Sequence, residues 1–272
     1  MLRVLATTFV LSFFVTSAWA QIQPAPGGPS APRSVAKNPA AKAKTRAKQA
    51  TPAESGPCRI GVIPVVGSKF AVQKIGLTVF NNDDADVAIE SWGLDDLVVA
   101  RVRAAAGSAA GVRRIAYPQD AFAAYERPAP ALFRNRQDDL TAIVRQITAN
   151  AGCESYVVVM KFTAQMNGTN QPLRGIGVYN RGIGSLISLT RLFANIQLTV
   201  FDGQTYAIRK KPFELGTALA SDLAGEDPLT KLDNAAFPEP PTAASTSATL
   251  RDGTRALVAA HLDKALPPLL GQ

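Results

Sequence analysis

Two apolar runs, each opened by a cysteine, constrain the fold of this chain more than any other feature. They read CRIGVIPVVG from Cys58 and CESYVVVMKF from Cys153. Both are short and rich in β-branched residues, which is typical of buried strands. If they are neighbouring parallel strands, both sulfur atoms lie at the same end of a sheet, close enough to bond. Parallel strands also require a long crossover between them.

Helical and strand patterns alternate along the rest of the chain. Helical patterns fall at residues 94–106, 138–151, 214–223 and 250–266, the last ended by Pro267-Pro268. Strand patterns fall at residues 112–118, on both sides of Asp202-Gly203, and in an excursion over residues 70–90 that turns at residues 81–84. Residues 225–247 are expected to be irregular. We therefore expect an α/β fold, a single domain with a mixed sheet flanked by helices, plus β-hairpin excursions.

The N-terminus has the pattern of a secretory signal peptide. One base, Arg3, precedes an apolar run, and Ala18-Trp19-Ala20 supplies small residues at the cleavage site, so residues 1–20 are expected to be removed. An uncleaved anchor is the alternative, but the apolar run is shorter than the roughly 20 residues of a spanning helix. Export to the periplasm is therefore expected, with association to the outer membrane left open.

Residues 21–56 form a basic segment rich in proline, alanine and lysine, which we expect to be a disordered linker. Six of its residues are bases against the single acid Glu54, so it holds +5 of the chain's net charge of +8. The bases are Arg33, Lys37, Lys42, Lys44, Arg46 and Lys48. Such a segment suits an anionic envelope surface, or only a solvated linker, and it does not require nucleic acid. Residues 57–272 are expected to form the folded domain.

Export makes the cysteines candidates for a structural Cys58–Cys153 disulfide, because exported proteins meet an oxidising compartment. A reactive or metal-binding pair is the alternative.

The order of these segments resembles that of the CsgG/TolB-N-like (LpoB-like) superfamily of bacterial envelope proteins. CRIGVIPVVG resembles its opening strand, VRRIAYP its second strand, and NAGCESYVVVMKF its shared turn and strand. ANIQLTVFDGQTYAIRKK resembles its paired strands. The chain departs by inserting residues 68–91, by a glycine-rich stretch, and by lacking the usual lipidation cysteine. The resemblance implies an accessory or assembly role in the envelope, exercised by binding.

The residues offer little for catalysis or metal binding, so no catalytic residues and no cofactor are expected. The single histidine, His261, lies in the last helical pattern, where it is expected at the margin of an amphipathic helix. It cannot complete a zinc site with two distant cysteines. Asp83, Asp84 and Asp86 form a weak calcium candidate, because the glycine and glutamate of a calcium loop are missing.

The stretch RGIGVYNRGIGS, residues 174–185, contains Arg-Gly-Ile-Gly twice. It does not match a phosphate loop, because the third glycine of the dinucleotide pattern is absent. Two interpretations remain: an interaction loop on a membrane or partner, or a long connection with bends, where glycine allows unusual backbone angles or close approach. The candidate interaction residues are Arg174, Gly175, Gly177, Tyr179, Arg181, Gly182 and Gly184.

The function expected from the sequence is that of an exported, non-catalytic binding or assembly protein of the cell envelope. Its expected partner is an envelope protein or an anionic envelope surface, with peripheral membrane contact left open. The alternative is a periplasmic hydrolase that uses carboxylates on an envelope polymer.

Overall fold

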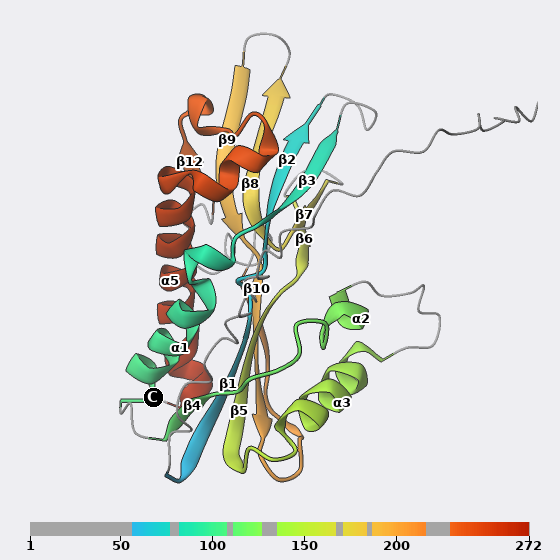
Figure 1. Ribbon diagram of the computed structural model, residues 1–272, viewed down its shortest axis with the longest axis vertical. Coiled ribbons are helices and arrows are strands. Elements are labelled where there is room, and N and C mark those ends of the chain that lie inside the picture. Colours follow the sequence, from blue (N-terminus) through green and yellow to red (C-terminus); the bar gives the residue numbers. More distant parts are fainter. Residues whose placement is uncertain are drawn as a thin grey trace, which may run out of the picture. The chain divides into compact units, whose positions relative to one another are not determined.

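The computed structural model describes residues 56–76, 82–107, 111–126, 135–166, 171–183, 187–215 and 229–271, all within the unit Pro52–Gln272 (Figure 1). The expected signal peptide and nearly all of the expected linker lie outside the described residues. No helix in the described ranges is long and apolar enough to cross a membrane.

The first sheet contains both cysteine-led strands at its centre. Its strands are β1 (Cys58–Val65), β4 (Val112–Arg114), β5 (Cys153–Lys161), β10 (Ile196–Asp202) and β11 (Ile208–Leu215), in the order β11-β10-β5-β1-β4. Strand β1 runs parallel to β4 and β5, whereas β10 runs antiparallel to β5 and β11. The sheet is therefore mixed, and the α/β fold is confirmed.

The second sheet takes in both the excursion and the glycine-rich stretch. Its strands are β2 (Lys69–Ile75), β3 (Asp83–Ala88), β8 (Ile176–Ile183), β9 (Ile187–Ala194) and β12 (Thr230–Leu232), in the order β12-β9-β8-β2-β3. Strand β3 begins at Asp83, so the expectation that residues 81–84 all form the turn was wrong. Cross-strand pairing decides this, because Asp84 lies opposite Gln73 and accepts its side-chain N–H at 3.0 Å.

The two sheets meet at one level, where several strands pass from one sheet to the next. Strand β1 continues into β2 through residues 66–68, and β9 continues into β10 through Asn195. Strand β5 leads into a small hairpin of β6 (Thr163–Gln165) and β7 (Pro172–Arg174), and β7 leads into β8 through Gly175. Asn195 is fully buried there; its backbone N–H donates to the Gly175 carbonyl at 2.8 Å and its side chain to the Leu173 carbonyl at 2.9 Å.

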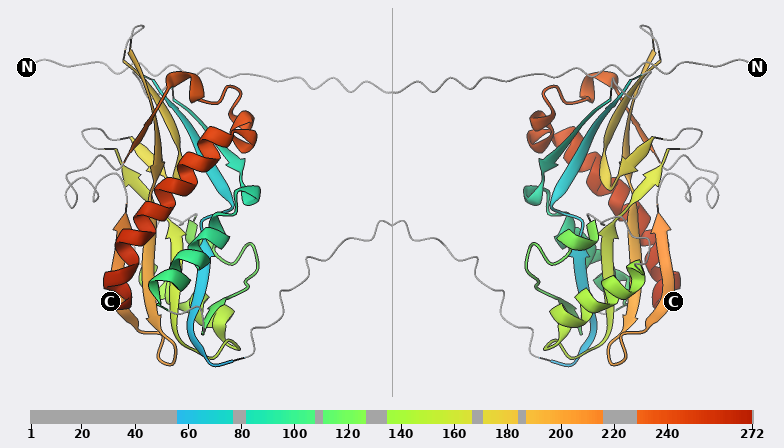
Figure 2. Two further views of the ribbon diagram at one scale, coloured as in Figure 1. Left: turned by 90° about the vertical axis from the view of Figure 1, so that its left-hand side faces the viewer. Right: turned by 90° about the vertical axis from the view of Figure 1, so that its right-hand side faces the viewer.

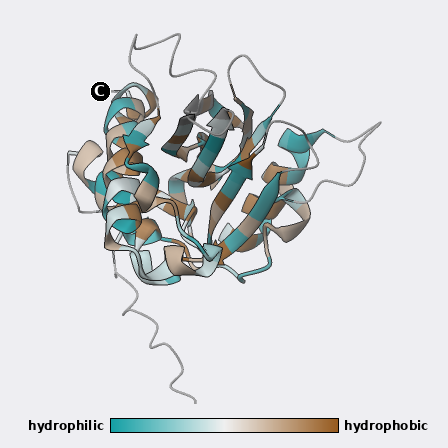
Figure 3. Ribbon diagram, turned by 90° about the horizontal axis from the view of Figure 1, so that it is seen from above, coloured by the Kyte–Doolittle hydropathy of each residue, from teal (hydrophilic) through white to brown (hydrophobic). Residues whose placement is uncertain are grey.

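Helices α1 (Leu94–Ala105) and α5 (Ala248–Leu270) cover one face of both sheets (Figure 2). Their apolar residues share one core cluster with strands of the two sheets. In the first turn of α1, Asp95 accepts the backbone N–H of Gly67 at 2.8 Å and so ties the helix to the bend between β1 and β2. Figure 3 shows the layers from above.

The opposite face has two separate covers. Helices α2 (Ala123–Glu126) and α3 (Arg136–Thr148) lie on the first sheet, where Leu140 and Val144 join a second core cluster. The β6–β7 hairpin lies on the second sheet, where Leu173 packs in a third cluster with Tyr179 and Phe193. Each cover thus has its own apolar core.

Some expected boundaries were wrong. Helix α5 continues through Pro267 and Pro268 to Leu270, and Gly271 ends it in the left-handed region with its N–H donating to the Pro267 carbonyl. The fixed φ of proline is compatible with a helix, so the backbone stays helical through both residues, although each proline removes one backbone hydrogen bond.

The strand expected over residues 112–118 ends at Arg114. Residues 214 and 215, expected to be helical, end β11, and the rest of that expected helix lies outside the described residues. The stretch 225–247, expected to be irregular, includes β12 and two short 3-10 helices, Asn234–Ala236 and Pro241–Thr246. A third 3-10 helix, Glu90–Trp92, precedes α1.

Candidate functional site

Cys58 and Cys153 form a disulfide, as expected. The two residues are register partners of β1 and β5, with Cα atoms 4.5 Å apart, and both are buried. Because both sulfur atoms are in the bond, neither is a free thiol or thiolate ligand. The bond fixes the start of β1, where the chain enters the domain.

The first Arg-Gly-Ile-Gly tetrad has a structural explanation at both glycines. Gly175 has φ +62° at the junction of the sheets, in the left-handed region that side chains disfavour. A Cβ at Gly177 would lie 2.3 Å from the carbonyl oxygen of Ala71 on β2. Unusual backbone angles and close approach therefore account for these two positions.

Residues 176–183 of this stretch form strand β8, which corrects the expectation of an irregular connection over these positions. Tyr179 is buried, and its ring centroid lies 6.3 Å from that of Phe193. Arg181 and Gly182 lie farther along β8, and Gly184 falls outside the described residues. Hydrophobic burial on both sides of β8 holds the strand in the sheet. A role of this stretch in binding remains a prediction.

The three aspartates of the weak calcium candidate are divided between the two faces of β3. Strand alternation places Asp84 and Asp86 on one face and Asp83 on the other. The carboxylate of Asp84 is occupied by Gln73 and by Arg174, whose guanidinium nitrogen lies 3.5 Å away. Among the described residues, no group of three acidic, cysteine or histidine side chains is arranged to hold a metal ion.

His261 is buried in α5, rather than at the margin of the helix as expected. One side of its ring interacts with the backbone of Ala194 on β9, whereas Nδ1 is buried with no hydrogen-bond partner in the described part of the chain. Burial lowers the pKa of His261, the Ala194 hydrogen bond opposes this, and the nearby Lys264 lowers the pKa further.

This burial predicts a loss of stability in mild acid. Because the folded-state pKa of His261 lies below the ordinary value of about 6.5, the unfolded chain binds the proton more tightly. The contribution of His261 to stability is complete above pH 6.5 and decreases as the pH falls below it. We expect His261→Gln, which keeps a donor and does not titrate, to reduce the difference in urea midpoint between pH 7.5 and pH 5. An unchanged difference would contradict this assignment.

A cavity of about 1070 Å³ opens between the two covers. Helices α2 and α3 line one side, and the β6–β7 hairpin with Gly175 and Ile176 lines the other. Lys69 and Asp86 of β2 and β3, Lys161 at the end of β5, and Gln197 and Thr199 of β10 complete it. The volume is at the upper end of the range for ligand sites, and the first tetrad forms part of the wall.

The lining carries a net positive charge. Its bases are Lys69, Arg136, Lys161 and Arg174, and its acids are Asp86 and Glu126, a formal balance of +2. The guanidinium carbon of Arg136 lies 4.6 Å from the centre of the Tyr125 ring, an arrangement that holds this base on the wall by a cation–π contact.

Lys161 is the most unusual of these bases, because it is half-buried. Its ammonium group donates to Ser68 Oγ at 3.2 Å and to the Lys69 carbonyl at 3.3 Å. Burial lowers the pKa of Lys161, while the charges of Glu126, Asp86 and Asp95 act in the opposite direction. A half-buried ammonium with no carboxylate within ion-pair distance among the described residues is unfavourable, so this position is suited to an anion.

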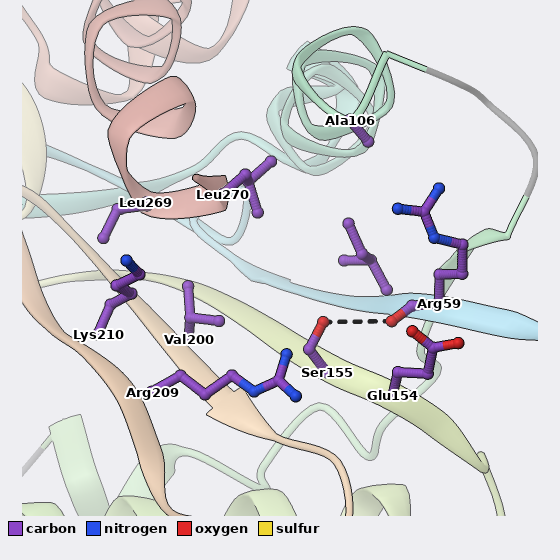
Figure 4. Close-up of a pocket in the computed structure, with 10 residues that line it drawn as sticks. Arg59, Ala106, Glu154, Ser155, Val200, Arg209, Lys210, Leu269 and Leu270 are labelled. Carbon is purple, nitrogen blue, oxygen red and sulfur yellow. Dashed lines mark hydrogen bonds between the residues drawn. The ribbon is translucent and has the colours of Figure 1, made fainter. Parts of the chain in front are cut away.

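A second, smaller cavity of about 220 Å³ lies where α1 and α5 end over the first sheet (Figure 4). Arg59 and Glu154 lie on one side of it, and Lys210 lies beside Leu269 at the end of α5. Cations are favoured near the C-terminal ends of helices, so the bases at this place have a structural explanation. Arg209 is paired with Asp202 at 2.9 Å.

The residue pattern singles out Arg174 and Gly175 of the larger cavity as interaction candidates and Asp86 as a weak calcium candidate, and gives no role to the other lining residues. Lys161 gave one usable signal, a charge at the end of an apolar strand. Arg136 and Glu126 gave none, because they belong to separate segments that only the fold brings to the cavity.

Comparisons with known proteins add little. No family model matches the chain, and no curated protein matches it. Among solved structures, the crystal structure of protein XCC0632 from Xanthomonas campestris, assigned to family DUF330, aligns over 81% of this chain and 88% of its own. The identity is 8% and the TM-score is 0.29, values that carry no argument about fold or function.

Proposed function

We propose that this protein is an exported, non-catalytic binding or assembly protein of the bacterial cell envelope, and that it binds an anionic partner in the cavity between the two covers. The main support for this proposal is the cavity itself, which is large, open and lined by four bases and two acids. Complementary charge steers and selects a partner, so this lining favours a negatively charged one.

Further features support the envelope setting. The Cys58–Cys153 disulfide fits a protein that folds in an oxidising compartment. The signal-peptide pattern of residues 1–20 and the basic segment 21–56 agree with export and with an anionic surface nearby. The resemblance to CsgG/TolB-N-like proteins points to the same setting.

Point substitutions in the cavity test this proposal better than deletion of residues 174–188, which would remove the whole of β8. Arg136→Gln with Arg174→Gln brings the formal charge of the lining from +2 to zero. We expect this double variant to lose at least about tenfold in capture of partners from envelope fractions after crosslinking, because one lost charge interaction in an interface costs about 1.4 kcal/mol or more.

A matched control changes the net charge of the protein by the same amount elsewhere. Lys231→Gln on β12 with Arg251→Gln on α5 alters exposed bases outside the cavity lining. This control is expected to capture partners like the unmodified protein. Equal capture by all three proteins, or equal loss in both double variants, would reject the cavity as the binding site.

A further inference from the structure

The ammonium of Lys161 has one N–H donor with no partner among the described residues. Two of its three N–H groups are accounted for by Ser68 Oγ and the Lys69 carbonyl, both of them uncharged acceptors. Among the described residues, no carboxylate lies within ion-pair distance of Lys161. One N–H donor of a charged group thus remains for a group that enters the cavity.

Gly175 holds the Lys161 side chain in this position. A Cβ on Gly175 would lie 3.0 Å from Cδ and 3.2 Å from Cβ of Lys161, so the lysine stem lies flat against the glycine backbone. The left-handed φ of Gly175 turns the chain at the same point. The glycine of the first tetrad is therefore a positioning residue for Lys161.

The acids of the cavity restrict what Lys161 can accept. Asp86 and Glu126 line the same cavity and act on Lys161 through their charges. They would repel a dianion such as phosphate, but they can accept hydrogen bonds from N–H or O–H groups. A glutamate side chain brings only one negative charge to Lys161, and the other carboxylates of an acidic peptide can stay in solvent, so such a side chain is better tolerated beside the two acids than a compact dianion.

Resting on the function proposed above, we propose that the cavity binds a peptide segment through a side-chain carboxylate held by Lys161, with the peptide's own N–H groups donating to Asp86 and Glu126. The amide and hydroxyl side chains of Gln197, Thr163 and Thr199 supply further partners for a peptide backbone. The volume of about 1070 Å³ accommodates several residues of such a segment.

The test observes Lys161 directly by NMR. It uses the protein without residues 1–20, with its lysines labelled with carbon-13. The Cε–Hε signals report the charge on each lysine, and Lys161→Met identifies the signal of interest. We expect an N-acetylated tetraglutamate amide to shift the Lys161 signal saturably and to raise its titration midpoint. The corresponding tetraglutamine peptide and inorganic phosphate are expected to leave it unchanged.

Affinity for the tetraglutamate peptide provides the second measurement. Lys161→Met is expected to weaken binding at least about tenfold, whereas Lys264→Met on the exposed side of α5 keeps the affinity of the unmodified protein. If Lys161→Met fails to fold, Lys161→Arg, which keeps the positive charge and removes the labelled lysine, identifies the signal instead, and the shift of that signal in the unmodified protein decides the matter. The inference is overturned if the tetraglutamate peptide does not shift the Lys161 signal, or if inorganic phosphate shifts it equally.

The two proposals can fail separately. If envelope capture depends on Arg136 and Arg174 while the tetraglutamate peptide leaves Lys161 unaffected, the proposed function stands and the carboxylate site is rejected. If the peptide binds at Lys161 while capture is indifferent to the cavity variants, the site stands and the proposed function is rejected.

Discussion

Replacement of both cysteines, Cys58→Ala with Cys153→Ala, is expected to lower the free energy of unfolding by about 2–5 kcal/mol. The bond joins residues 95 positions apart, so its loss frees a long loop in the unfolded chain. Alanine is chosen because both positions are buried, and a serine there would bury a hydroxyl group. Urea unfolding at pH 7.5, monitored by tryptophan fluorescence, measures the difference.

Reductant supplies the control for this experiment. It should destabilise the unmodified protein to about the level of the double variant and leave the double variant itself unchanged. If reductant lowered the stability of both proteins equally, or if the double variant matched the oxidised protein, the disulfide would not be the source of the stability.

Gly203→Ala is expected to destabilise the protein by about 3 kcal/mol, near the upper end of overpacking effects. Gly203 follows β10 and donates its N–H to the Glu154 carbonyl at 2.9 Å. An added Cβ would lie 1.9 Å from the carbonyl oxygen of Cys153 and 2.7 Å from the backbone carbon of Glu154. Backbone atoms cannot turn aside as a side chain can, so the β10–β11 turn must separate from the start of β5.

Gly152→Ala is the matched comparison. Gly152 has φ +60° but open space around its Cβ position, so alanine there suffers backbone strain of about 1–2 kcal/mol without a clash. In thermal or urea unfolding, the Gly203→Ala variant should be clearly less stable than the Gly152→Ala variant. The reverse order would contradict this prediction, because it would show that the clash at Gly203 is relieved at little cost in free energy.

The local elements could be predicted from the sequence where short-range physics decides them. The apolar, β-branched runs after Cys58 and Cys153 specify buried strands, and the Asp202-Gly203 turn joins two antiparallel strands as expected. The Asp202 side chain accepts the backbone N–H groups of Thr205 and Gln204, and these bonds lower the pKa of Asp202 to about 2. Interactions between residues this close in sequence can be recognised from the local sequence pattern.

The expectations were wrong at positions where contacts between distant parts of the chain determine the local structure. The stretch 174–185 reads as a flexible connection because glycine and arginine are frequent in it. Its conformation is set instead by pairing with β9 on one side and with β2 on the other, where Ala71 lies opposite Gly177, 106 residues later in the chain. His261 reads as a helix-margin residue, yet the approach of β9 buries it.

Periodicity and turn residues, which act over a few residues, predicted the α/β class, the two cysteine-led strands and the helices α1, α3 and α5. The shared polarity of two expected parallel strands then placed the two cysteines together. Long-range packing, by contrast, sets the junction of the two sheets, the cavity between the two covers, and the grouping of Lys161, Gly175, Asp86 and Glu126 around that cavity. Those residues come from segments with no local relation, and their proximity depends on sheet register and on packing across the whole domain. The physical reason is that a site built from long-range contacts leaves no periodic signal in any one of its segments.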